Sequence, residues 1–334
     1  MLALFQSRKA VSVWLFAVAA IILAMVVIGG LTRLTGSGLS ITEWDPIMGA
    51  IPPMSDAAWA AAFAKYQQIP QYRLENAHMD LEGFKAIFWW EWTHRLLGRL
   101  IGVVFFVPFV VFAWTGAIRR EEWPRMILLF ALGGLQGFIG WWMVESGLET
   151  RVSVSQYRLA IHLGTAIMLL GAILWTALEY LRGPATGAKG TPAGAARWSL
   201  VLVALVYVQM LLGALVAGLH GGLVYNTWPS MDGRFFPELS FTWASFFEDP
   251  GLAQFDHRIG AYLVLVVGLW TAWRVRMLAA SQAVAALILM QVALGIATLL
   301  AQAPVGMAAA HQLVAALLFS ASVWLAYEIA RRSA

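Results

Sequence analysis

Long apolar stretches recur along this chain, separated by shorter polar segments. A helix that crosses the hydrocarbon core of a bilayer needs about 20 mostly apolar residues. Eight stretches meet this requirement, so the pattern predicts an all-α integral membrane protein with eight transmembrane helices. The predicted spans are residues 11–30, 93–114, 126–144, 159–180, 199–219, 257–273, 283–302 and 309–330.

The composition agrees with a membrane protein. Of the 334 residues, 60% are hydrophobic and 12% are charged, whereas soluble domains contain about 25% charged residues. The net charge of +4 comes from scattered basic residues, which form no patch for nucleic acid. The chain has no cysteine. This excludes disulfides, thiolate metal sites, iron–sulfur clusters and covalent attachment of c-type haem.

The distribution of charge predicts the orientation. With both termini placed in the cytoplasm, the cytoplasmic segments hold 12 of the 22 Lys and Arg residues and 4 of the 18 acidic residues. Cytoplasmic loops of membrane proteins are enriched in Lys and Arg, so we predict that both termini are cytoplasmic. The long connections 31–90 and 220–256 are then expected at the outer face, with a short helix at 57–66 in the first.

An internal repeat is visible in the sequence. The segment EWTHR (91–95) opens the second span, and QFDHR (254–258) opens the sixth. A glutamine and a glycine four residues apart recur in the third and seventh spans, at Gln136, Gly140, Gln291 and Gly295. We therefore predict two four-helix bundles related as parallel repeats, residues 1–181 and 199–334. The Gly/Pro/Ala-rich segment 182–198 is expected to be a cytoplasmic linker.

Four of the six histidines lie near the starts of even-numbered spans, at His94, His162, His257 and His311. These spans all run inwards, so the four imidazoles are expected at one depth, near the outer face. An ionisable residue inside a span is costly and indicates a function. Facing helices can hold a macrocycle between two imidazoles. We predict that His94 pairs with His162, and His257 with His311, as axial ligands of haem iron. A di-iron site would need more carboxylates than the spans contain.

Three arginines accompany these histidines. Arg95 and Arg258 follow a histidine directly, and Arg158 precedes His162 by one helical turn. An arginine pairs with a carboxylate through two hydrogen bonds, as haem propionates would allow. An arginine at a span end also reaches lipid headgroups. The sequence leaves both interpretations open.

One acidic residue distinguishes the halves. Glu91 lies three residues before His94, and the corresponding residue in the second half is Gln254. The two side chains have similar shapes, but only a carboxyl group exchanges a proton. We therefore predict that Glu91 is catalytic, that the first half is reactive, and that the second half holds a permanent cofactor. The structural alternative is that Glu91 is a residue of a helix N-terminus, favoured by the helix dipole.

The chain resembles the haem A synthase family, in its proteobacterial and mitochondrial form. The resemblance covers nearly the whole chain, through GGLTRLTGSGLS (29–40), EWTHRLLGR (91–99), YRLAIHLG (157–164), GALVAGLHGGLVYNTWP (213–229), FDHRIGAY (255–262) and AAAHQLVA (309–316).

The resemblance implies an enzyme of respiratory membranes that oxidises the C8 methyl of haem O to a formyl group through successive hydroxylations. It implies haem O bound in the first half by His94 and His162, with Arg95 and Arg158, and haem b in the second half by His257 and His311, with Arg258. It implies catalysis by Glu91. Some members carry a cysteine pair in outer loops, and this chain has none.

The expected partners are haem O, membrane lipid and an unidentified electron donor or acceptor, with haem O synthase or oxidase assembly factors suggested by the pathway. The expected location is the bacterial inner membrane. The alternatives are a di-haem membrane electron-transfer cytochrome, which would usually place haems near both faces, and a transporter, which would need broken helices and a polar site at mid-membrane.

Overall fold

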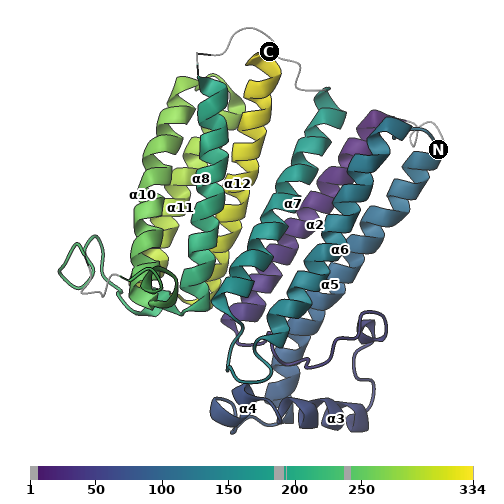
Figure 1. Ribbon diagram of the computed structural model, residues 1–334, viewed down its shortest axis with the longest axis vertical. Helices are drawn as coiled ribbons and strands as arrows, with labels where there is room; N and C mark the ends of the chain where they lie inside the picture. Colours follow the sequence, from purple (N-terminus) through teal and green to yellow (C-terminus); the bar gives the residue numbers. More distant parts are fainter. Residues whose placement is uncertain (1–6, 184–191, 193, 237–241, 334) are drawn as a thin grey trace.

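A computed structural model describes residues 7–183, 192, 194–236 and 242–333 (Figure 1). This part of the chain is helical and contains no β-strand, which confirms the all-α prediction. Within it, eight helices are long and apolar enough to cross a membrane. They are α2 (Arg8–Leu34), α5 (Leu81–Trp114), α6 (Trp123–Glu145), α7 (Gln156–Arg182), α8 (Ala195–Gly218), α10 (Pro250–Arg274), α11 (Ala279–Leu300) and α12 (Val305–Ser333).

Short helices occupy the connections. They are η1 (Met48–Ala50), α3 (Asp56–Tyr66), α4 (Pro70–Leu74), η2 (Arg120–Glu122), η3 (Gly221–Leu223) and α9 (Ser245–Glu248). Helix α3 confirms the helix predicted at 57–66. Side chains that accept from free backbone N–H groups define several helix starts. Asp80 accepts from the N–H of Gly83 at the start of α5, and Asp249 accepts from that of Leu252 at the start of α10.

Helix α5 is longer than the predicted span, because it begins at Leu81 and not near residue 93. Its extra turns carry Phe84 and Phe88, which are buried against Tyr66 and Ile69 in a small apolar cluster outside the main core. Hydropathy finds the part of a helix that suits a bilayer and misses turns that are stabilised by packing outside it. Glu91 therefore lies within a long helix, and the interpretation of it as a residue of a helix N-terminus is wrong.

The connection between the two halves is shorter than the predicted linker 182–198, because Arg182 is still helical and the second helix begins early. Helix α7 ends at Arg182, but α8 already begins at Ala195, so the last four residues of the predicted linker are helical. Residues 184–191 and 193 of that linker lie outside the described residues.

The eight long helices stand in two groups (Figure 1). Helices α2, α5, α6 and α7 form one group, and α8, α10, α11 and α12 form the other. Helix α7 packs against α8 and α12, and α2 also packs against α12. One apolar core runs through this seam and includes Ile167, Leu170 and Phe319. The two groups therefore form one packed body.

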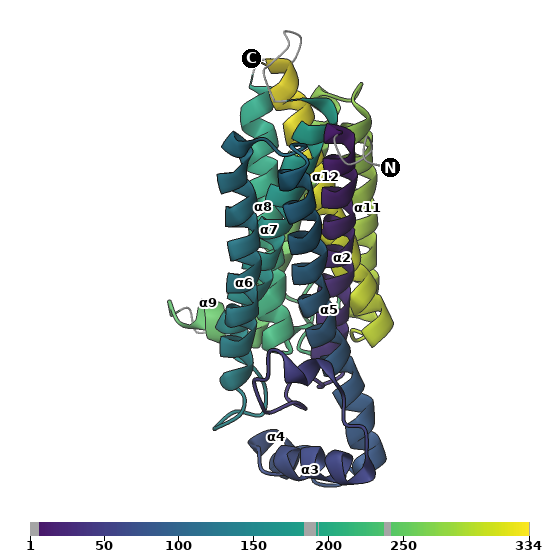
Figure 2. The ribbon, with the colours of Figure 1, turned by 90° about the vertical axis from the view of Figure 1, so that its right-hand side faces the viewer.

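The ends of the bundle differ. Helix α2 starts and α12 ends at the same end, whereas α3 and α4 lie beyond the opposite end (Figures 1 and 2). The connection that contains α9 lies toward that opposite end too (Figure 2). The two long connections therefore share one end of the bundle, as the sequence predicted.

Candidate functional site

Each of the four partly buried histidines within the long helices lies against a glycine of the helix that precedes its own among the eight. A Cβ atom placed on Gly29, Gly140, Gly213 or Gly295 would lie 2.8 to 3.1 Å from the Cε1 atom of a histidine. The histidines in that order are His94, His162, His257 and His311. A side chain at Gly29, Gly140 or Gly295 would collide with the imidazole, because Cβ contacts below 3.0 Å essentially do not occur, and at Gly213 the contact of 3.1 Å would be tighter than most. Glycine therefore lets the Cε1 edge of each ring approach the neighbouring helix closely.

Three of the four histidines lie near the starts of their helices, although these helices begin three to seven residues before the predicted spans. His162, His257 and His311 come six or seven residues after the first residues of α7, α10 and α12. His94 lies deeper in its helix, because α5 begins earlier than predicted. The rings of His257 and His311 are 6.4 Å apart between centroids, at an angle of 75°.

A glutamine lies one turn before the glycine in three of the helix pairs. Gln136 Nε2 is 3.1 Å from His162 Nδ1 and donates to the backbone oxygen of His162 at 2.7 Å. Gln209 Nε2 is 3.0 Å from His257 Nδ1 and donates to the backbone oxygen of His257 at 2.8 Å. The third contact is weaker, with Gln291 Nε2 at 3.3 Å from His311 Nε2.

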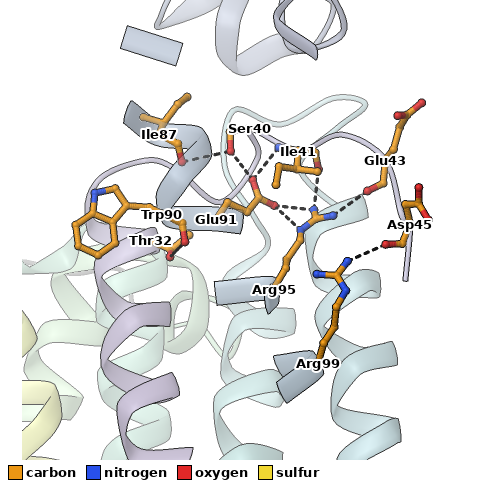
Figure 3. A network of polar contacts seen from close by, with 10 residues as sticks. All are labelled: Thr32, Ser40, Ile41, Glu43, Asp45, Ile87, Trp90, Glu91, Arg95 and Arg99. Atoms are coloured by element: carbon orange, nitrogen blue, oxygen red, sulfur yellow. Dashed lines mark hydrogen bonds and ion pairs between the residues drawn. The ribbon is translucent and has the colours of Figure 1, made fainter. Parts of the chain in front are cut away.

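The carboxylate of Glu91 is buried and satisfied, with a relative exposure of 2%. Its Oε2 atom accepts from Ser40 Oγ at 2.7 Å and from the backbone N–H of Ile41 at 2.8 Å (Figure 3). Its Oε1 atom accepts from Arg95, in an ion pair of 2.6 Å. This carboxylate therefore joins α5 to the outer connection.

Arg95 and Arg99 also bind the connection between α2 and α5. Arg95 donates to the backbone oxygens of Ile41 and Glu43, at 2.7 and 2.8 Å. One turn later, Arg99 donates to those of Asp45 and Pro46 (Figure 3). Residues 41–46 thus follow the side of α5 through backbone oxygens, and all three nitrogens of the Arg95 guanidinium are occupied.

The second half contains a corresponding network in which the residue at the place of Glu91 donates hydrogen bonds to the connection and does not accept them. Gln254 is as buried as Glu91, with a relative exposure of 3%. Its Nε2 atom donates to the backbone oxygens of Gly221 and Tyr225. Arg258 donates to Gln254 and to the backbone oxygens of Tyr225 and Ser230. The first connection offers donors to a carboxylate, whereas the second offers acceptors to an amide.

Arg158 lies beside the third span. Its guanidinium stacks on the ring of Trp142 at 4.3 Å and donates to the backbone oxygen of the same residue at 2.5 Å. It therefore ties the start of α7 to the end of α6.

The sequence interpretation missed several members of this site. Ser40 and the backbone of Ile41 gave no signal, because their contact with Glu91 spans about 50 residues of chain. The glycines Gly29 and Gly213 were also missed. The spacing of four residues between Gln209 and Gly213, shared by the third and seventh spans, would have indicated the second of them.

Comparison with known proteins identifies the family. Residues 12–323 match the model of a family described as Cytochrome oxidase assembly protein. The Heme A synthase of Parvibaculum lavamentivorans is 49% identical over 97% of this chain and 96% of its own length. The Heme A synthase of Caulobacter vibrioides is 47% identical over 97% of both chains. This chain belongs to the haem A synthase family.

The residues present in this family member fit haem. The described residues contain no group of three or more His, Cys, Asp or Glu side chains that would hold a bare metal ion. A haem needs only two axial ligands, because the macrocycle supplies the others. The buried Nδ1 atoms of His94 and His311 find no hydrogen-bond partner in the described structure. Partly buried imidazoles that lie against glycine in this way suit axial ligation.

Proposed function

We propose that this chain is a haem A synthase, an oxidoreductase that converts the C8 methyl of haem O into a formyl group. The observation that carries the proposal is an asymmetry between two similar halves. Both halves contain two partly buried histidines that lie against glycines, but a buried carboxylate accompanies only the first pair. The site that carries the proton-exchanging group is suited to the substrate. The similar site without such a group is suited to a cofactor.

The first half would bind the substrate. His94 and His162 would be the axial ligands of haem O, and Arg158 would bind a propionate. Arg95 would have one N–H left to offer a propionate, because four of the five N–H groups of its guanidinium already donate to Glu91, Ile41 and Glu43. Haem O reaches such a site from the bilayer, since helices α5 and α6 expose large apolar side chains.

The second half would hold haem b between His257 and His311. Arg258 is suited to a propionate, because its buried Nε atom has no partner among the described residues. A bound haem b supplies electron transfer, which the protein orients and insulates. The residues 1–181 and 199–334 are thus proposed as a substrate half and a cofactor half.

Glu91 is proposed to exchange protons. Conversion of a methyl to a formyl group withdraws protons as well as electrons, so the site needs a group that takes them up. Ser40 is placed to assist, because a hydroxyl both donates and accepts. When Glu91 Oε2 carries a proton, it can donate to Ser40 Oγ, which donates to it in the structure.

The proposed setting is the bacterial inner membrane, with both termini cytoplasmic and the haem sites near the outer face. The multi-pass character rests on the eight apolar helices, and the orientation rests on the charge distribution. An electron donor or acceptor is required, and haem O synthase or an oxidase assembly factor is the proposed source or recipient of haem.

The first experiment purifies the full chain in mild detergent with haem O supplied, then separates its extracted haems by chromatography with mass detection. We expect haem b together with haem O, or with a hydroxylated or formyl derivative. Haem b alone would favour the alternative, a di-haem electron-transfer cytochrome. A folded preparation without haem would refute both.

A pair of variants tests the role of Glu91. Glu91→Gln removes the proton-exchanging group, and general acid–base catalysis contributes about 100- to 10,000-fold. We therefore expect formyl product to fall at least about 100-fold with haem content retained. Arg99→Lys is the control, because it weakens the attachment of the same connection at Asp45 and Pro46 and leaves Glu91, Ser40 and Arg95 in place. Equal losses in the two variants would assign Glu91 a structural role in holding the outer connection.

A further inference from the structure

The two outer connections share a sequence pattern that extends the internal repeat. The segment GLSITEW (38–44) comes after α2, and GLVYNTW (222–228) comes after α8. The residues at the fourth place of each segment, Ile41 and Tyr225, accept through their backbone oxygens from the arginine that follows the histidine of α5 or α10. The two segments are therefore equivalent in contacts as well as in sequence.

The residues that follow the two tryptophans differ in polarity. Large apolar side chains of the first connection are exposed by 49% to 80%: Trp44, Ile47, Met48, Ile51 and Met54. Residues 44–54, which we call the apolar segment, contain one charged residue. The second connection has two charged residues within 228–234, and its Met231 is buried. Among the described residues, exposed aliphatic side chains therefore follow the tryptophan only in the half that carries Glu91.

Contacts with α5 place the apolar segment beside a membrane span. Helix α5 begins at the outer end of the bundle, so Arg99 lies one turn, or about 6 Å, deeper than Arg95. Arg95 donates to backbone oxygens within residues 41–43, and Arg99 donates to those of residues 45–46. A Cβ atom on Gly49 would lie 2.9 Å from Nη2 of Arg99. The chain thus runs inwards along α5, level with the ends of α2 and α8, whereas α3 and α4 lie farther out (Figure 1).

The surroundings of the apolar segment at this depth are apolar too. The ring of Trp44 lies 6.3 Å from that of Trp141, near the end of α6, and tryptophans are typical of the membrane–water interface. On the face of α5 that carries Arg99, the next turns expose Val103 and Val107 by 57% and 53%. The exposed side chains of the segment therefore continue the apolar surface of a span, which lipid covers.

We propose that residues 44–54 insert their exposed side chains into the outer leaflet of the bilayer and form the rim at which haem O passes from lipid to the first half. The role as a rim rests on the proposed function, whereas the insertion does not. The segment contacts both α5 and α6, and the same connection supplies Ser40 and Ile41 to Glu91. An apolar haem that crosses this rim arrives next to the carboxylate, and a permanent cofactor in the second half needs no such rim.

The insertion is tested by the depth of single fluorescent labels, because the natural chain has no cysteine. Ile47→Cys carries a label on the apolar segment. Leu74→Cys on α4 is the control, because Leu74 is 75% exposed and Ile47 80%. Each full-length protein is placed in vesicles of phosphatidylethanolamine and phosphatidylglycerol. Fluorescence is quenched either by phospholipid with a nitroxide near the carbonyl end of its acyl chain or by aqueous iodide.

We expect the label at residue 47 to show blue-shifted emission, quenching by the spin-labelled lipid and protection from iodide. The label at residue 74 should show the opposite behaviour. Quenching of the label at residue 47 by iodide and not by lipid would overturn the insertion. Protection of that label from both quenchers would also overturn it, because a second copy or another protein would then cover the segment.

The role as a rim is tested by uptake of haem O from the vesicle membrane, followed by the absorbance of the bound haem. We expect uptake to be slower in Ile47→Asp than in the wild type, and unchanged in Leu74→Asp. Equal uptake rates in these two variants would overturn the role and leave the proposed function in place. Folded wild-type protein that takes up no haem would remove the proposed function, and the depth of the labels would still decide the insertion.

Discussion

The contact between Gly140 and His162 offers a sharp test of the site. A Cβ atom on Gly140 would lie 2.9 Å from the Cε1 atom of His162. Three residues earlier on the same helix, a Cβ on Gly137 meets nothing within 4 Å. Gly140→Ala and Gly137→Ala thus make the same chemical change on the same helix, and only the first touches a proposed ligand.

The expected difference follows from this geometry. Ordinary contact begins at 3.4 Å, so the imidazole must move by about 0.5 Å, which is about the tolerance of a functional site. Overpacking costs about 1–3 kcal/mol. The gain in helix propensity from Gly to Ala, about 1 kcal/mol, is common to both variants and cancels in their comparison. Gly140→Ala should therefore be less stable than Gly137→Ala by about 1–3 kcal/mol.

Two measurements on detergent-solubilised protein check this expectation. Unfolding is followed by tryptophan fluorescence, and bound haem per polypeptide is determined from the extracted pigment. We expect Gly137→Ala to match or exceed the wild type in both, and Gly140→Ala to lose both stability and haem. Equal stability and equal haem content in the two variants would refute the contact between this glycine and a haem ligand.

Two further predictions concern the outer connections. Arg95→Lys keeps the charge but loses the planar guanidinium that joins Glu91 to the backbone of residues 41–43. Proteolytic cleavage within residues 41–46 should therefore become faster, while α5 stays protected. An unchanged rate of cleavage would contradict this account. Burial and the nearby charge of Arg33 lower the pKa of His220 from its ordinary value. The Nη2 atom of Arg33 lies 3.0 Å from the Nε2 atom of His220. The unfolded chain then binds the proton more readily than the folded protein, so the free energy of unfolding should fall as pH drops below about 6.5. His220→Asn should remove this pH dependence. Asparagine tolerates the left-handed φ of 53° at this position.

Much of the fold was predictable because insertion into a bilayer depends on local composition. Each span is a run of about 20 apolar residues, and such a run is visible without knowledge of its neighbours. The positions of His162, His257 and His311 near the starts of their helices followed from the places of those runs along the chain. The contrast between Glu91 and Gln254 was visible because the two halves repeat one pattern.

The parts that were not predictable depend on residues far apart in the chain. The early start of α5 follows from the packing of Phe84 and Phe88 against the outer helices, outside any apolar run of membrane length. The partners of Glu91 were hidden because Ser40 and Ile41 are brought to it by the fold of a long connection.

The sequence by itself determined which helices form and which chemical groups they carry, because hydropathy and residue identity are local properties. The tertiary structure alone decided which groups meet. The contacts of His94 with Gly29 and of His162 with Gly140 depend on how neighbouring helices are rotated and shifted against one another. Rotation and shift are determined by the packing of whole helix surfaces, and no short segment of sequence contains that information.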